Sequence, residues 1–268
     1  MVTADYHMHT RFSSDSDADP KDMVEAAIKK GLQTICFTDH QDTDYPEDQS
    51  MFRIDMERYI PTITELQERY KGQIDIRLGV EIGLQPHLGE WYRSYIKAYP
   101  FDFVIGSVHV VEKMDPYNGE FFDKYSDREG YRRSFEETLE NVRAIQDFDV
   151  LGHMDYIVRY GKEQAAHYCW KDHADIIDEI LRELIDSGKG IEMNMAGFKY
   201  GLSFCHPYPD IIKRYRELGG EILTVGADAH KPEHIAYNYA QAAEILKEAG
   251  FAYYTVFHKR KPEFVKIV

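Results

Sequence analysis

The sequence predicts an α/β protein in which parallel strands alternate with helices and close into a single barrel. Segments typical of a strand and of a helix alternate about seven times along the 268 residues. No linker rich in Gly, Pro or Ser and no low-complexity segment divides the chain, so one domain over residues 1–268 is expected. Seven or eight such units in roughly 250 residues favour a closed barrel over an open sheet.

The predicted strands are compact apolar runs, and QTICFT is a typical one because it is rich in strand-forming residues. They cover residues 3–8, 33–38, 74–82, 101–108, 148–152, 190–194, 221–227 and 251–257. The predicted helices lie between the strands, at residues 19–31, 52–70, 87–98, 127–146, 171–187, 208–218 and 233–249. In the first helix, Pro20 suits the opening turn and Gly31 suits a C-terminal stop.

The composition limits the classes of partner. The formal net charge is −15, and a surface this acidic repels nucleic-acid phosphates and anionic lipids. No apolar run approaches the roughly 18 residues of a membrane span. The three cysteines are widely spaced without a CxxC pair, and the N-terminal MVTADYHMHT does not resemble a secretion signal. The expected protein is reduced and cytoplasmic, with no nucleic-acid or membrane partner.

Residues capable of metal or acid–base chemistry recur where the predicted strands end. They are His7, His9, Asp39, His40, Glu81, His109, His153, Asp228 and His230. The carboxyl ends of all strands in a parallel barrel meet on one face, where active sites are built. Side chains more than 200 positions apart in the sequence are therefore expected to converge there.

The individual signals differ in strength. A single His after a strand is more often a hydrogen-bonded structural residue than a ligand. His7 and His9 are a stronger signal, because alternate residues of a strand point the same way and can offer two imidazoles to one ion. Asp228 and His230 are spaced in the same way. The competing interpretation is a set of independently satisfied polar residues at loop mouths, and it leaves their recurrence at six strand ends unexplained.

The motifs in their order resemble the PHP superfamily, named for polymerase and histidinol phosphatase domains. The motifs are HMH (7–9), TDH (38–40), GVEIG (79–83), GSVH (106–109), GHMD (152–155) and GADAH (226–230). The segment MNMAGFKYG (193–201) is similar to an element of the histidinol-phosphate phosphatases of that superfamily. The resemblance covers almost the whole chain, and it implies a distorted (β/α)7 TIM-like barrel.

The resemblance also implies three divalent metal ions, which could be Zn, Fe or Mn. The first ion would be held by His7, His9, Glu81 and Asp228, and the second by Glu81, His109 and His153, with Glu81 bridging. The third would be held by Asp15, His40 and His230. Two positions depart from the commonest family pattern: some relatives carry a His in place of Asp15, and an Arg is frequent in place of Lys199.

The implied activity is hydrolysis of L-histidinol phosphate, a small phosphomonoester, by a metal-activated hydroxide. A phosphomonoester is a dianion, so divalent ions must reverse the local charge of this acidic chain. The expected substrate contacts are Arg159 and Lys199 as cations, with His206 and Asn194 as weaker candidates. Asp228 and His230 are the expected catalytic residues. Asp42 is a candidate for the pocket that binds the organic part of the substrate. The sequence does not indicate an oligomeric state.

Other functions remain open at this point. One is a PHP phosphoesterase acting on another small phosphomonoester or on a nucleotide. Another is a non-catalytic metal-binding or interaction domain with a decayed site, although all nine ligand positions hold usable donors. The last is an amidohydrolase-like barrel that cleaves C–N bonds, which also uses an HxH motif.

Overall fold

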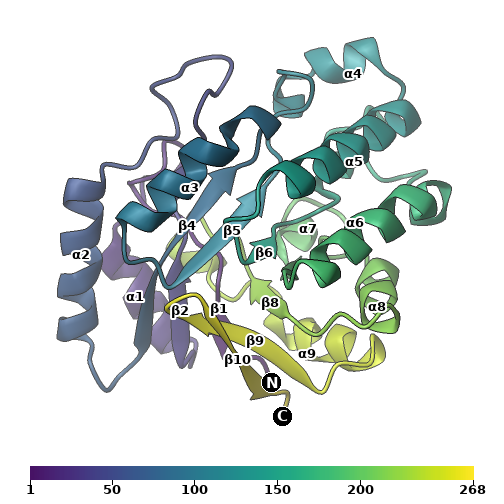
Figure 1. The fold of residues 1–268 in the computed structure, drawn as a ribbon. Helices are drawn as coiled ribbons and strands as arrows, with labels where there is room; N and C mark the ends of the chain where they lie inside the picture. The colour runs from purple at the N-terminus through teal and green to yellow at the C-terminus, as the bar shows by residue number, and fades with distance from the viewer.

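The computed structural model describes residues 1–268 and shows a barrel of parallel strands surrounded by helices (Figure 1). The strand order is β1-β2-β4-β5-β6-β7-β8, and short β3 pairs with β4 beside this path. These strands are β1 (Ala4–Asp5), β2 (Thr34–Phe37), β3 (His40–Gln41), β4 (Asp75–Gly83), β5 (Phe103–Ser107), β6 (Val150–Leu151), β7 (Gly190–Asn194) and β8 (Leu223–Gly226). The fold class is the one that the sequence predicts.

The barrel closes between its first and last strands. The backbone N–H of Tyr6 donates to the carbonyl of Val225 at 2.9 Å, and that of His9 donates to Ala229 at 2.8 Å. Met8 and Ala229 form a parallel bridge, in which the backbone N–H of Ala229 also donates to the carbonyl of His7 at 3.3 Å. The segments that follow β1 and β8 therefore form the seam of the barrel.

Helices cover the outside of the barrel because parallel strands need crossover connections. The helices are α1 (Pro20–Lys29), α2 (Met56–Arg69), α3 (Gly89–Ala98), α4 (Glu120–Lys124), α5 (Asp127–Ala144), α6 (Ala174–Asp186), α7 (Ala196–Lys199), α8 (Pro209–Glu217) and α9 (Tyr239–Glu248). Five short 3₁₀ helices lie at Pro86–Leu88, Pro116–Asn118, Tyr156–Arg159, Trp170–His173 and Pro232–His234. Local sequence accounts for the helix starts: Asp19 caps α1, and Ser126 with Glu129 forms a capping box on α5.

The last predicted strand exists but does not join the barrel. It is β9 (Tyr253–His258), which pairs antiparallel with β10 (Lys261–Lys266), a strand that the sequence analysis does not predict. This hairpin lies beside both chain termini (Figure 1), and Tyr6 Oη donates to the carbonyl of Phe257 at 2.9 Å. Asp102, at the amino end of β5, accepts from the backbone N–H of Lys259 at 2.9 Å. The hairpin therefore packs against the amino ends of the strands.

The core is one cluster of 73 buried apolar residues, so the chain has a single hydrophobic core. α4 and α7 are short helices in the loops after β5 and β7 that the sequence analysis does not predict. None of the helices combines the length and the apolar character needed to cross a membrane.

Candidate metal centre

The nine predicted ligands meet at the carboxyl ends of the strands, as the barrel geometry requires. The rings of His7 and His9 lie 5.0 Å apart at the seam. His40 pairs in register with Glu81, because β3 lies beside the last part of β4. Five overlapping groups of three His, Asp or Glu side chains have ligand atoms within 4.8 Å of one another. Eight of the nine residues belong to these groups, and Asp15 adjoins them.

Glu81 is the hub of the cluster, and it is fully buried. Its Oε1 lies 2.9 Å from Nε2 of His153 and 3.3 Å from Nε2 of His109. Its Oε2 lies 3.0 Å from Nε2 of His7, 3.1 Å from Nδ1 of His40 and 3.4 Å from Nε2 of His9. One carboxylate thus faces five imidazoles, and its two oxygens face different ones.

Two more carboxylates, Asp228 and Asp15, flank His230. Oδ1 of Asp228 lies 3.3 Å from Nε2 of His9 and 3.4 Å from Nδ1 of His230. Asp228 has a backbone φ of 51°, which is the left-handed region that Asp tolerates better than most residues. Oδ2 of Asp15 lies 3.0 Å from Nε2 of His230 and 3.7 Å from Nε2 of His40. Asp15 is the most exposed ligand candidate, because 40% of its side chain is accessible.

Burial and the close packing of charges shift the pKa values of several residues in the cluster. Burial alone lowers the pKa of His7, but the carboxylates around it, led by Glu192 and Glu81, raise that pKa well above its usual value. Burial and two neighbouring imidazoles instead hold the pKa of His9 well below its usual value. Burial raises the pKa of Glu81, yet the imidazoles around it, led by His7, hold that pKa well below its usual value. The carboxylate of Glu81 is therefore ionised at neutral pH.

The donor set fits divalent metal ions. Nδ1 of His7 and Nδ1 of His109 are each 2.6 Å from an outer carboxylate, so in the neutral rings the Nε2 atoms carry lone pairs. Those lone pairs face the oxygens of Glu81, and only a cation or a proton between them relieves the repulsion. Nε2 of His9 and Nδ1 of His40 are buried without a hydrogen-bond partner. Two donors that each lie about 2.1 Å from one ion are about 3–3.5 Å apart, which is the spacing found here.

Glu192 and Asp42 supply the outer carboxylates. Oε1 of Glu192 contacts His7, and Oδ2 of Asp42 contacts His109. The structure thus places Asp42 against the ring of His109, whereas the sequence makes it a candidate for contact with the organic part of the substrate. The signal for Glu192 is present in the sequence, because a charged residue stands in the middle of the buried strand GIEMN. Glu192 is nevertheless not among the predicted site residues.

The expected cations lie together near the cluster. The guanidinium of Arg159 is 3.6 Å from the ring centroid of Tyr200, and the ammonium of Lys199 is 4.8 Å from the same centroid. Nζ of Lys199 also donates to the backbone carbonyl of Asp228 at 2.7 Å. Burial lowers the pKa of Lys199.

The two weaker candidates, Asn194 and His206, are buried and pair through their backbones. The Asn194 amide nitrogen donates to Glu192 at 3.2 Å, and its oxygen accepts from the Ala196 N–H at 2.9 Å. Nδ1 of His206 lies 2.7 Å from Asp155, while its Nε2 has no partner. The chain therefore already occupies the polar atoms of Asn194, but it leaves one nitrogen of His206 free.

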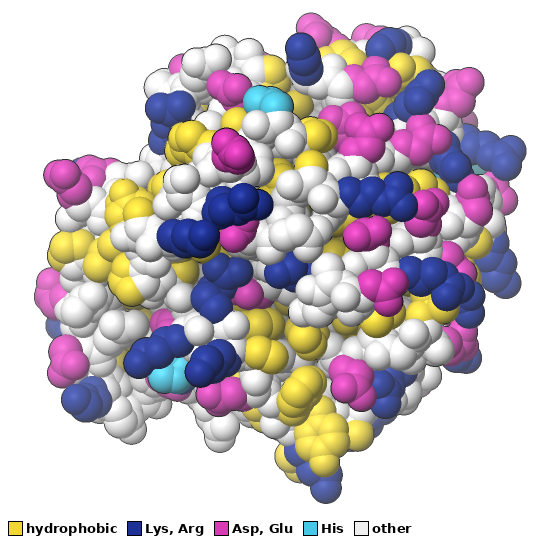
Figure 2. All heavy atoms as spheres, viewed as in Figure 1, with side chains coloured by type: hydrophobic (Ala, Val, Ile, Leu, Met, Phe, Trp, Pro, Cys, Tyr) yellow, Lys and Arg dark blue, Asp and Glu magenta, His cyan; other side chains and the backbone are white.

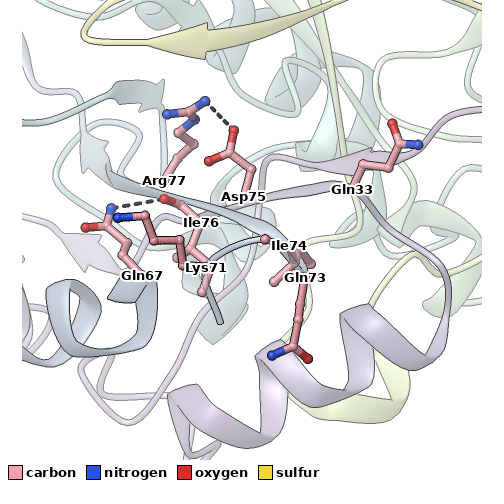
Figure 3. Close-up of a pocket in the computed structure, with 9 residues that line it drawn as sticks. Gln33, Gln67, Lys71, Gln73, Ile74, Asp75, Ile76 and Arg77 are labelled. Atoms are coloured by element: carbon pink, nitrogen blue, oxygen red, sulfur yellow. Dashed lines mark hydrogen bonds and ion pairs between the residues drawn. The ribbon is translucent and has the colours of Figure 1, made fainter. Parts of the chain in front are cut away.

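A separate hollow of about 450 Å³ lies away from this cluster (Figure 3). It is lined by polar residues at the amino end of β4, including Asp75, which pairs with Arg77, and by Gln67, which donates to Ile76. Glu81 lies near the opposite, carboxyl end of the same strand. The hollow is therefore not part of the metal centre.

Fold and site together define a barrel protein with a buried, multinuclear metal centre at the carboxyl ends of its strands. The chain belongs to the PHP domain family, whose model matches residues 5–196.

Named relatives cover nearly the whole chain. It is 32% identical to a histidinol-phosphatase of Lactococcus lactis over 94% of this chain and 93% of that protein. It is 31% identical to a protein of Clostridium acetobutylicum named "Probable histidinol-phosphatase", over 92% and 93% of the two chains. A crystal structure of the Lactococcus lactis histidinol phosphate phosphatase, complexed with zinc, L-histidinol and phosphate, superposes with a TM-score of 0.91. That match covers 97% of this chain and 98% of the other, at 32% identity.

Proposed function

We propose that this protein is a metal-dependent histidinol-phosphatase, which hydrolyses L-histidinol phosphate to L-histidinol and phosphate in histidine biosynthesis. The observation that carries the proposal is the buried Glu81 hub with its five imidazoles. It stands in a chain whose fold matches, over nearly its whole length, a structure that binds zinc, L-histidinol and phosphate. The activity would reside in a single domain covering residues 1–268.

Three sites would share the nine ligands. The first is His7, His9, Glu81 and Asp228; the second is Glu81, His109 and His153; and the third is Asp15, His40 and His230. Zn, Fe or Mn ions held there would supply positive charge opposite the phosphate dianion and lower the pKa of bound water. The chain contributes a buried scaffold, because outer hydrogen bonds fix the rings of His7 and His109.

Arg159 and Lys199 would bind the phosphoryl oxygens as charge shifts onto them during hydrolysis. Both cations lie against the ring of Tyr200, which keeps them close enough to each other to share one anionic ligand. Nε2 of His206 is a further atom that we assign to substrate contact, because the chain leaves it unpaired. Asn194 would act beside it by fixing the loop after β7.

Asp228 and His230 would be the catalytic residues that handle the proton delivered to the leaving alkoxide. Nδ1 of His230 lies 3.4 Å from Oδ1 of Asp228, and its Nε2 lies 3.0 Å from Asp15. The pair can therefore hold a proton at the edge of the cluster.

The partner would be a small phosphomonoester in the cytoplasm rather than a nucleic acid. The net charge of −15 repels a polyanion, whereas a small dianion needs only the local positive charge of the site. Figure 2 shows Lys and Arg side chains interspersed with Asp and Glu on the face that it presents. The face shown has no continuous basic stripe of the kind found on nucleic-acid-binding proteins.

The test is a substrate panel run on protein whose metal content has been measured. Phosphate release is compared for L-histidinol phosphate, serine phosphate, nucleoside monophosphates and p-nitrophenyl phosphate. A clear preference for L-histidinol phosphate supports the proposal. A flat profile removes the role in histidine biosynthesis but leaves a phosphoesterase, and absence of metal with no turnover removes both.

A further inference from the structure

Glu192 is a buried carboxylate whose two oxygens are directed at different parts of the proposed metal centre. The residue is 1% exposed and lies in β7. Its Oε1 is 2.6 Å from Nδ1 of His7. Its Oε2 accepts from the backbone N–H of His153 at 3.0 Å and from Nδ2 of Asn194 at 3.2 Å. One side chain therefore connects a ligand from the β1 segment with a ligand from the loop after β6.

Glycines leave the space that this carboxylate occupies. A Cβ atom at Gly226 would lie 2.4 Å from Oε1 of Glu192 and 2.4 Å from Cβ of His7. A Cβ atom at Gly152 would also face Oε2 of Glu192, at 3.6 Å, besides colliding with Ser107 at 2.3 Å. Close packing around Glu192 thus leaves its carboxylate little freedom to move away from its partners.

We propose that Glu192 is a positioning residue that orients His7 and His153 together, and so prepares two metal sites at once. This inference rests on the proposed metal centre. By accepting the proton on Nδ1 of His7, Glu192 selects the tautomer whose Nε2 lone pair points to the ion. By accepting from the backbone of His153, it fixes the loop that carries the second ligand. Neither action requires Glu192 to contact a metal or the substrate.

The isosteric Glu192→Gln variant separates this role from simple space filling. An amide has one acceptor oxygen and one NH₂ donor, so it can accept from His7 or from the His153 N–H, but not from both. In either orientation, the NH₂ group faces a donor. The shape of the side chain is retained, so a residue that only filled space would tolerate the change.

The experiment measures metal retention rather than turnover. Metal-loaded wild-type and Glu192→Gln proteins are dialysed against graded concentrations of a chelator, and the ions left per chain are counted by elemental analysis. We expect the two sites bridged by Glu81 to lose roughly 10- to 100-fold in affinity. The third site, at Asp15, His40 and His230, should hold its ion as in the wild type.

Asp102→Asn is the matched control, because Asp102 is also buried and accepts from two backbone N–H groups, those of Leu78 and Lys259. It lies at the amino end of the barrel, so this variant should lose stability without losing ions. Should Glu192→Gln not fold, Asn194→Ala removes one donor from Oε2 and should weaken the same two sites less severely.

Wild-type metal retention in a folded Glu192→Gln protein, or in Asn194→Ala where that variant replaces it, overturns the inference. Equal loss of ions from Asp102→Asn also overturns it. Either result leaves the proposed function standing if the wild type binds metal and hydrolyses the substrate. A wild type that binds no metal removes the proposed function itself.

Discussion

Replacing Glu81 by Gln is the most direct test of the bridging role proposed for this residue. The change keeps the size of the side chain but removes its charge and turns one oxygen into an NH₂ group. Oε1 faces His109 and His153, whereas Oε2 faces His7, His9 and His40.

The magnitude follows from that division between the two oxygens. An amide nitrogen is not a metal ligand, so whichever way the amide turns, one of the two sites loses its oxygen donor. We therefore expect at least one ion per chain fewer than in the wild type. We also expect kcat/KM to fall by about 100-fold or more, which corresponds to about 2.7 kcal/mol of transition-state stabilisation.

Elemental analysis and phosphate release on the same preparation measure both effects. Circular dichroism and thermal unfolding establish that the variant is folded, so that lost ions are not a consequence of lost structure. A folded Glu81→Gln protein with wild-type metal content and wild-type kcat/KM would refute the bridging role.

Three further outcomes are expected. Arg159→Ala should lower kcat/KM roughly 10- to 1000-fold at unchanged metal content if the guanidinium binds the phosphoryl group, and unchanged kinetics would reject that contact. The pKa values of His7 and His109 are raised in the metal-free fold, although burial opposes the carboxylates. The protonated rings therefore contribute fully to the free energy of unfolding below about pH 6.5, the usual pKa of His. That contribution is lost as the pH rises through the raised pKa values of the folded state. Urea unfolding of metal-free protein should show that decline, and a rise in stability over the same range would contradict it. Arg260→Ala should lower the free energy of unfolding by about 1–3 kcal/mol, because Asp149 stays buried without its cationic partner and keeps only the hydrogen bond from the Val104 N–H. Specific activity of the folded fraction should not change.

Much of the site was predictable because it depends on a short-range rule. Compact apolar runs mark the strands, and the residue just past each run lies at the carboxyl end of the barrel. The positions of His109 and His153 follow from this rule without knowledge of any contact. The spacing of His7 and His9 follows from the two-residue period of a strand.

The outer carboxylates could not be placed in the same way. Asp42 and His109 are 67 residues apart in the sequence, and no spacing rule relates such positions. Gly83 shows the physical requirement, because a Cβ atom there would lie 2.6 Å from Cγ of Asp42. The sequence contains this glycine, but the need for a residue without a side chain is evident only once the loop after β3 packs against β4.

The hairpin is the other feature beyond local reasoning. Residues 251–257 have the composition of one more barrel strand, and composition does not tell which neighbour a strand pairs with. The decisive contacts are specific polar ones: Asp102 accepts from Lys259, and Arg260 pairs with Asp149. They attach the hairpin to the amino end of the barrel, which leaves β1 free to close with β8.

Closure of the barrel between β1 and β8 also brings together residues of the proposed metal centre. The seam hydrogen bonds of residues 6–9 with residues 225–229 involve the segments that carry His7 and Asp228. Asp5, two residues before His7, accepts from the backbone N–H groups of Ala227 and Ala236 and so ties the first strand to the segment after β8. An ion held by residues from both segments can bind tightly only when the seam is closed. Metal binding and barrel closure are therefore thermodynamically linked, and ions in the first site should stabilise the seam of the barrel.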